Sequence, residues 1–155
     1  MNYVEKAMEY NNRGFNCSQS VFAAFAQPLG IDEKTAGAIA TNLGTGCRTG
    51  SVCVAVSGAL MALGLYAGHT TPESTEEKGR AYEISREFVR RFEAVKGTTV
   101  CSELLGGNPS VPEDRKMLRE TGRFSRLCPS FVELAASILQ DYLEELGKLE
   151  KDAWK

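Results

Sequence analysis

The chain has 155 residues, close to the usual size of one domain, so it can bury a hydrophobic core without disulfides or metal ions to hold it together. Its composition, 43% hydrophobic and 25% charged residues, is that of an ordinary globular protein. A net charge of −2 gives no electrostatic footprint for nucleic acid, so we expect no nucleic-acid partner. We predict a single domain over residues 1–155.

Helical periodicity runs through nearly the whole chain, which predicts an all-α bundle of about six or seven helices. The first helix is expected over residues 2–11. A second helix begins at Asn16, a good N-cap, and ends before Pro28, and a third runs from Asp32 to Gly44. The first residues lack the basic and then apolar pattern of a secretory signal, so we expect a cytoplasmic protein.

An uncharged run from Ser51 to Gly68 raises the question of a membrane span. The run has 18 residues, whereas a span needs about 20, and Ser57, Gly58 and Gly64 make it weakly hydrophobic. We therefore predict a central buried helix whose small residues allow close packing, and no membrane span.

Two long helices are expected in the second half of the chain. One follows His69 and ends at Gly97, with acidic residues in its first turns and basic residues in its last, as the helix dipole favours. The other is expected to begin at Pro129 and to run to about Lys148. Between them lies the least regular segment, in which we predict two short helices, over residues 100–105 and 113–120.

The stretch GTGCRTGSVC, residues 44–53, is rich in glycine and holds two cysteines. It lacks the Lys-Ser/Thr pair of a P-loop and follows a helix where a P-loop follows a strand, so we do not expect it to bind phosphate. Its glycines allow the backbone to turn sharply beside a sulfur site, with Arg48 as a nearby cation. Cys47 is interpreted as a resolving thiol, a replacement ligand or a spare free cysteine.

Four of the five cysteines fall where helices are expected to begin. They are Cys17 after the cap Asn16, Cys53 two residues after Ser51, Cys101 two residues after Thr99, and Cys128 directly before Pro129. The free N–H groups and the dipole at a helix start favour a thiolate, and one such end should lower a thiol pKa by about one unit. Four ends brought together would suit an anionic iron–sulfur cluster.

The spacing of these cysteines does not by itself identify a metal. Separations of 36, 48 and 27 residues match neither zinc-binding Cys-x2-Cys pairs nor the clustered cysteines of ferredoxins. The site would therefore have to be assembled by the tertiary structure.

Several segments together resemble one protein family. The order FNCSQSVFAAFA, SVCVAVSGALMALGL, CSELLG and LCPSFV is similar to the C-GCAxxG-C-C family, small proteins described as redox-active with four signature cysteines. The resemblance implies that those cysteines are Cys17, Cys53, Cys101 and Cys128. Ala55 and Gly58 match the family's C-G-A-x-x-G motif, whereas Val54 replaces its glycine, and Cys47 is an addition. A related domain occurs in a multihaem cytochrome with an iron–sulfur site, which supports redox or metal chemistry.

The preferred hypothesis is an iron–sulfur cluster with two irons, which serves electron transfer or redox sensing. Its ligands would be Cys17, Cys53, Cys101 and Cys128. Zinc fits the same four ligands and would be structural, with Cys47 as a further candidate ligand. The rival is a metal-free thiol–disulfide protein in which Cys47 pairs with Cys53, or Cys101 with Cys128.

A third hypothesis is an interaction bundle without catalytic function, in which the cysteines are only part of the core. The single histidine, His69, has no clear carboxylate partner and gives little support to a Cys-His hydrolase. The sequence leaves open whether the protein is an enzyme, what its redox partner is, and whether it forms a homodimer.

Overall fold

The computed structural model describes residues 2–149 and confirms the all-α prediction. Its α-helices are α1 (Tyr3–Asn12), α2 (Cys17–Ala26), α3 (Glu33–Ala40), α4 (Val54–Ala67), α5 (Thr75–Lys96), α6 (Cys101–Leu105), α7 (Pro112–Glu120) and α8 (Arg123–Glu145). Three short helical turns connect them: η1 (Gln27–Leu29), η2 (Thr41–Leu43) and η3 (Gly46–Gly50). Extended pairing within the described part of the chain is limited to one isolated antiparallel bridge, Val52 with Val100.

Side-chain caps begin several of these helices. Asn2, Asn16, Asp32 and Ser74 each accept a hydrogen bond from the backbone N–H three residues further on, which satisfies a donor that has no partner inside the helix. Asn16 additionally forms a capping box with Gln19. The prediction of Asn16 as the cap of the second helix is therefore confirmed.

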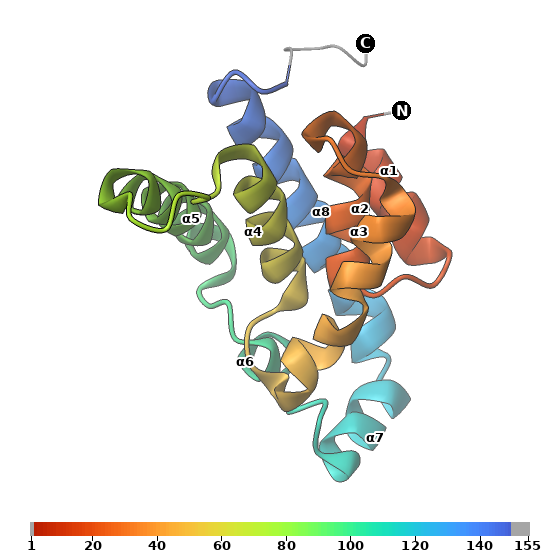
Figure 1. The fold of residues 1–155 in the computed structure, drawn as a ribbon. Coiled ribbons are helices and arrows are strands. Elements are labelled where there is room, and N and C mark those ends of the chain that lie inside the picture. The colour runs from red at the N-terminus through yellow and green to blue at the C-terminus, as the bar shows by residue number, and fades with distance from the viewer. Residues whose placement is uncertain (1, 150–155) are drawn as a thin grey trace.

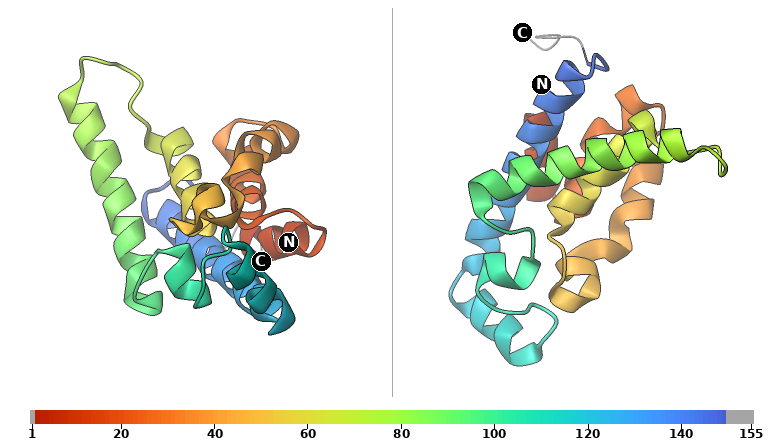
Figure 2. Two further views of the ribbon diagram at one scale, coloured as in Figure 1. Left: turned by 90° about the horizontal axis from the view of Figure 1, so that it is seen from below. Right: turned by 90° about the vertical axis from the view of Figure 1, so that its left-hand side faces the viewer.

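Helices α2 and α8 form the centre of the bundle (Figures 1 and 2). Helix α2 contacts α1, α3, α4 and α8, and every residue from Ser20 to Ala26 is buried. Helix α8 contacts α1, α2, α4, α5, α6 and α7. A helix that is apolar on all sides has to be buried, and this explains why other helices pack around α2.

The predicted central helix is present as α4, beginning at Val54. At Gly58 a Cβ atom would lie 2.7 Å from the Ser18 carbonyl oxygen, so only glycine allows α4 to approach α2 this closely. No helix within residues 2–149 combines the length and the apolar character that a membrane crossing requires.

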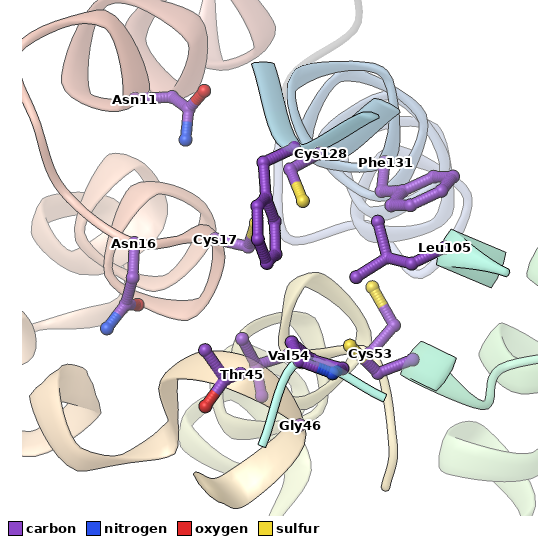
Figure 3. A pocket seen from close by; sticks show the side chains of 13 residues that line it. Asn11, Asn16, Cys17, Thr45, Gly46, Cys53, Val54, Leu105, Cys128 and Phe131 are labelled. Atoms are coloured by element: carbon purple, nitrogen blue, oxygen red, sulfur yellow. The ribbon is translucent and has the colours of Figure 1, made fainter. Parts of the chain in front are cut away.

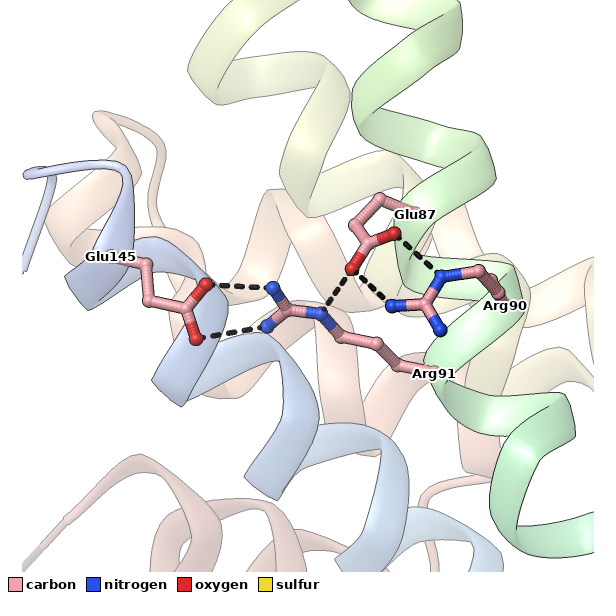
Figure 4. A network of polar contacts seen from close by, with 4 residues as sticks. All are labelled: Glu87, Arg90, Arg91 and Glu145. Atoms are coloured by element: carbon pink, nitrogen blue, oxygen red, sulfur yellow. Dashed lines mark hydrogen bonds and ion pairs between the residues drawn. The ribbon is translucent and has the colours of Figure 1, made fainter.

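Helix α5 lies across the bundle and is joined to α8 by charged side chains (Figure 4). The Arg91 guanidinium donates to both carboxylate oxygens of Glu145, at 3.0 and 2.6 Å, and it also lies 4.3 Å from the centre of the Tyr142 ring. Arg90 and Arg91 both donate to Glu87 on α5 and lower the pKa of its carboxyl to about 2. These contacts fix how α5 lies against the end of α8.

The start of the last helix was predicted wrongly. Helix α8 begins at Arg123, directly after Gly122 with φ +71°, and Pro129 lies inside it. Proline lacks the N–H that would bond the Ser125 carbonyl, so a proline is normally expected near a helix start. In this helix, Phe124 and Leu127 pack against the core. This packing outweighs the lost hydrogen bond, so the helix begins six residues before Pro129. Helices α6 and α7 closely match the two short helices that were predicted.

Candidate functional site

Four cysteines from separate parts of the chain line one pocket of about 230 Å³ (Figure 3). They are Cys17, Cys53, Cys101 and Cys128. The remaining lining residues are mostly apolar: Asn11, Asn16, Thr45, Gly46, Val54, Leu105, Pro109, Phe124 and Phe131. We call this the cysteine pocket. The structure thus brings together the four cysteines that the sequence singled out.

Cys17 enters the pocket as the first residue of α2. Its neighbour Asn16 accepts hydrogen bonds from the Gln19 N–H at 3.0 Å and from the Ser18 hydroxyl at 2.7 Å. The Asn16 side-chain amide donates to the Thr41 carbonyl at 2.9 Å, and the Ser18 hydroxyl also reaches the Ala40 carbonyl at 2.8 Å. These bonds attach the start of α2 to the end of α3 and thereby fix Cys17.

Cys53 and Cys101 are held next to each other by backbone hydrogen bonds. The Cys53 N–H donates to the Thr99 carbonyl at 2.7 Å, and the Cys101 N–H donates to the Ser51 carbonyl at 2.6 Å. These bonds flank the Val52–Val100 bridge. Cys53 is therefore the N-cap residue of α4 and Cys101 the first residue of α6, slightly later than the caps Ser51 and Thr99 that were predicted.

The glycine-rich loop forms one wall of the pocket through an unusual left-handed turn. Thr45, Gly46, Cys47 and Arg48 all have positive φ, between 56° and 63°. Each non-glycine residue in this conformation costs about 1 to 2 kcal/mol. At Gly46 a Cβ atom would lie 2.6 Å from the Ser51 nitrogen and 3.0 Å from the Cys101 Cβ, so glycine is required here. The predicted role of these glycines, close approach to the sulfur site, is confirmed at Gly46.

A contact from the α6–α7 connection supports the loop from the other side. The Asn108 side-chain amide donates to the Thr49 carbonyl at 3.3 Å, and its oxygen would lie only 2.1 Å from a Cβ on Gly50. The Asn108 oxygen also accepts from the Ser110 N–H and hydroxyl at 2.9 and 2.7 Å. Asn108 therefore joins two segments that both contribute residues to the pocket.

Cys128 does not lie at a helix start, contrary to the prediction. It is the sixth residue of α8, because that helix begins at Arg123. Three of the four pocket cysteines are thus at helix starts, and the fourth points inward from the body of a helix.

Burial, and not the helix dipole, dominates the acidity of two of these thiols. It raises the pKa of Cys53 to about 11, although the backbone N–H groups of Ala55 and Val56 act in the opposite direction, and it raises that of Cys101 to about 12. The expected lowering by about one unit is therefore wrong for both residues, because the apolar surroundings disfavour a charged sulfur more than the helix ends favour it.

Cys17 and Cys128 form a hydrogen-bonded pair whose side chains lie next to each other in Figure 3. The Cys17 thiol donates to the Cys128 sulfur, which raises the pKa of Cys17 and lowers that of Cys128. The four cysteines are thus arranged as two pairs, one joining α2 to α8 and the other joining the starts of α4 and α6. This pairing differs from both disulfides considered from the sequence.

The two other residues singled out for chemistry lie elsewhere. Cys47 is exposed and is not among the residues that line the pocket, so the structure does not place it as a replacement ligand. His69 follows the far end of α4 and does not line the pocket either.

The motif residues around Cys53 have structural explanations. Ala55 is fully buried, and Gly58 makes the close contact with Ser18, the residue after Cys17. Val54 is 4% exposed and lines the pocket. Its side chain is accommodated, so the departure from the family's glycine does not obstruct the helix start.

Sequence reasoning missed the apolar walls of the pocket. They are formed by Leu105, Pro109, Phe124 and Phe131. Phe131 falls within the predicted last helix, and the other three fall in the segment that was considered irregular. Only the hydrophobicity of Phe124 and Leu127 before Cys128 hinted that α8 begins earlier.

Among residues 2–149, no three histidine, cysteine, aspartate or glutamate side chains form a group that could hold a single metal ion. The four sulfurs surround a space and do not converge on one point.

Comparisons with known proteins identify the family. A search of curated proteins gave no match, and neither did a search of solved structures. A family profile described as "Putative redox-active protein (C_GCAxxG_C_C)" matches residues 15–142, a range that includes all four pocket cysteines. The chain therefore belongs to the C_GCAxxG_C_C family of proteins, which is described as redox-active.

Proposed function

We propose that the cysteine pocket binds an iron–sulfur cluster with two irons and that the protein transfers electrons or senses redox state through it. The observation that carries the proposal is the gathering of four cysteines, from α2, the N-cap of α4, α6 and α8, around one pocket. When bound, such a cluster accepts and releases electrons at a potential set by its surroundings.

The donor set and the space both suit this group. Four cysteine thiolates are the usual ligands of a two-iron cluster. The pocket of about 230 Å³ leaves room for several atoms among the sulfurs, whereas one zinc ion needs all four sulfurs about 2.3 Å from a single point.

The division into two pairs supports two irons in particular. In a two-iron cluster each iron takes two protein ligands. Cys17 and Cys128 form one pair through their hydrogen bond, and Cys53 and Cys101 form the other through the backbone bonds around the Val52–Val100 bridge.

Two features of the chain around the pocket would affect a bound cluster: backbone hydrogen bonds to sulfur and aromatic side chains that exclude water. The N–H groups of Ala55 and Val56 favour negative charge on the Cys53 sulfur, and hydrogen bonds to sulfur are one way in which proteins adjust cluster potentials. The aromatic rings of Phe124 and Phe131 lie along the pocket wall and limit the access of water to the sulfurs.

Anaerobic reconstitution with iron and sulfide tests the proposal. We expect two iron and two sulfide per chain, broad visible absorbance and no stoichiometric zinc. Cys17→Ser should lose most of the iron, whereas Cys47→Ser should retain it because Cys47 lies outside the pocket. Stoichiometric zinc in the purified protein, or equal iron in both variants, would overturn the proposal.

Thiol–disulfide exchange is the second candidate, favoured by the hydrogen bond between Cys17 and Cys128. The Cys128 thiolate would attack a partner's disulfide and release one partner thiolate. Cys17, after losing its proton, would then attack the Cys128 sulfur, release the second partner thiolate and close a Cys17–Cys128 disulfide. Two protein thiols are oxidised and one partner disulfide is reduced. Metal-free protein with this disulfide, mapped by mass spectrometry, would favour the second candidate.

A further inference from the structure

Three cationic side chains reach the wall of the cysteine pocket from outside. Arg48 Nη1 lies 3.5 Å from the Gly44 carbonyl oxygen, and a Cβ on Gly44 would contact both this nitrogen and the amide of Asn16, at 3.3 and 3.2 Å. Arg48 is thus next to Asn16, which lines the pocket.

The other two cations contact the opposite parts of the lining. Arg123 Nη1 donates to the Leu105 carbonyl at 3.1 Å, and Lys96 Nζ lies 5.2 Å from the centre of the Phe131 ring. Leu105 and Phe131 are both pocket residues. Arg48, Lys96 and Arg123, which we call the cationic rim, come from three different segments.

The cationic rim differs from the rest of the molecule in its charge and in its lack of ion pairs among the described residues. The chain has more acidic than basic residues, with 20 against 18. Yet within residues 2–149 no ion pair involves any of the three rim cations, and no hydrogen bond joins a carboxylate to a residue that lines the pocket. None of the three side chains therefore has an ion-pair partner in the described part of the chain, and each contacts a residue at or beside the pocket lining.

An apolar pocket that collects four thiolates has an electrostatic cost. Negative charge in such surroundings is expensive unless positive charge lies nearby, and every electron that enters adds to the cost. We propose that the cationic rim of Arg48, Lys96 and Arg123 offsets the negative charge of the pocket and thereby raises the reduction potential of whatever group the four cysteines hold. The part concerning the potential rests on the proposed function, whereas the part concerning the positive field does not.

The field can be measured on metal-free protein with two alkylating reagents of similar size. Iodoacetate is negatively charged and iodoacetamide is neutral, so the ratio of their rates at one cysteine reports the local potential, because thiolate reactivity cancels. We would measure the ratio at Cys128 by mass spectrometry in a Cys47→Ser background. Arg48→Gln and Arg123→Gln should each lower the ratio of the iodoacetate rate to the iodoacetamide rate several-fold. The effect of Arg48→Gln should be larger at low salt, because Arg48 is exposed and salt screens its charge. A ratio equal to that of Arg86→Gln, an ion-paired residue on α5, would overturn the inference.

Potentiometry of reconstituted protein tests the second part. Each neutral variant should make reduction about tenfold less favourable, which is about 59 mV for one electron. Arg123→Lys separates charge from structure. A potential like that of the wild type supports the inference, and a shift as large as that of Arg123→Gln overturns it for this residue. If wild-type protein takes up no iron, the proposed function fails, and the alkylation ratios still decide whether the rim acts on the pocket.

Discussion

Cys53 shows how a single residue belongs both to the hydrophobic core and to the site. It is 4% exposed and packs in the same core cluster as α2 and α8, while its sulfur lines the pocket. Burial raises its pKa from 9.0 to about 11. The same apolar contacts that stabilise the fold therefore keep this thiol protonated in the metal-free protein.

The raised pKa of Cys53 predicts how stability depends on pH. Below about pH 8 the thiol is protonated in both the folded and the unfolded chain, so it contributes no pH dependence. Between pH 9 and 11 the unfolded chain loses this proton and the folded chain retains it, so the free energy of unfolding of the metal-free protein should fall, by up to about 3 kcal/mol from this group.

Denaturant titrations from pH 7 to 10.5 measure this decline. Cys53→Ala should make it shallower, because alanine does not titrate. Val54→Ala, which changes a neighbouring buried side chain without removing a titratable group, should keep the slope of the wild type. Parallel slopes in Cys53→Ala and the wild type would show that the thiol does not cause the decline.

At the scale of the residue, the sequence indicated which cysteines lie together but did not predict the pKa values of their thiols. The type and positions of the cysteines singled out the four that line one pocket, because thiols at expected helix starts stood out. Their acidity was misjudged, since a pKa depends on the solvent excluded by residues such as Phe131 and Leu105, which only the folded chain brings nearby.

The crossing of α2 and α4 is the element contact on which the site depends most directly. Gly58 lies against the backbone of Ser18, the residue that follows Cys17, and α4 begins beside Cys53. The distance between these two helices therefore determines how far Cys17 and Cys53 are apart.

A matched pair of substitutions on α4 tests this contact. Gly58→Ala places a Cβ 2.7 Å from the Ser18 oxygen, so the helices must separate, and we expect a loss of stability of about 1 to 3 kcal/mol together with reduced iron uptake. Gly64→Ala meets nothing within 4 Å and should raise stability by up to about 1 kcal/mol through helix propensity alone. Denaturant unfolding and iron analysis provide both readings. Similar effects of the two substitutions would contradict the account.

Element boundaries were predictable where local chemistry decides them. Asn16 and Asp32 have caps that depend on neighbours three residues away, and both helices begin as expected. Pro129 is the opposite case. Its local preference for a helix start is overridden by the packing of α8 along six other helices, which no short window of sequence contains.

For the whole molecule, the cysteine pocket is where four helices meet that are distant in the sequence. The four cysteines lie in α2, at the N-cap of α4, in α6 and in α8, so a group bound to all four would link these four helices to one another. Such a group binds the folded chain and not the unfolded one, and it therefore stabilises the fold.

Loading with iron and sulfide should accordingly raise the melting temperature. We expect an increase of at least several degrees over the metal-free protein, measured anaerobically by circular dichroism. Cys17→Ser treated in the same way should show no such increase. An equal rise in that variant would indicate that the metal binds somewhere other than the pocket.

The all-α class and most helices followed from periodicity, because helix formation is encoded within a few turns. The convergence of the cysteines was a hypothesis from the sequence, since spacings of 36, 48 and 27 residues contain no local geometry. The pairing of Cys17 with Cys128 could not be predicted, because it depends on how α8 lies against α2.

The central claim is that four sulfurs of one chain surround a single cluster. X-ray absorption at the iron edge of the anaerobically reconstituted wild-type protein tests it most directly. Our account predicts iron coordinated by four sulfurs, two from cysteine and two from sulfide, with a second iron at close range. Coordination by nitrogen or oxygen, or the absence of a neighbouring iron, would contradict it.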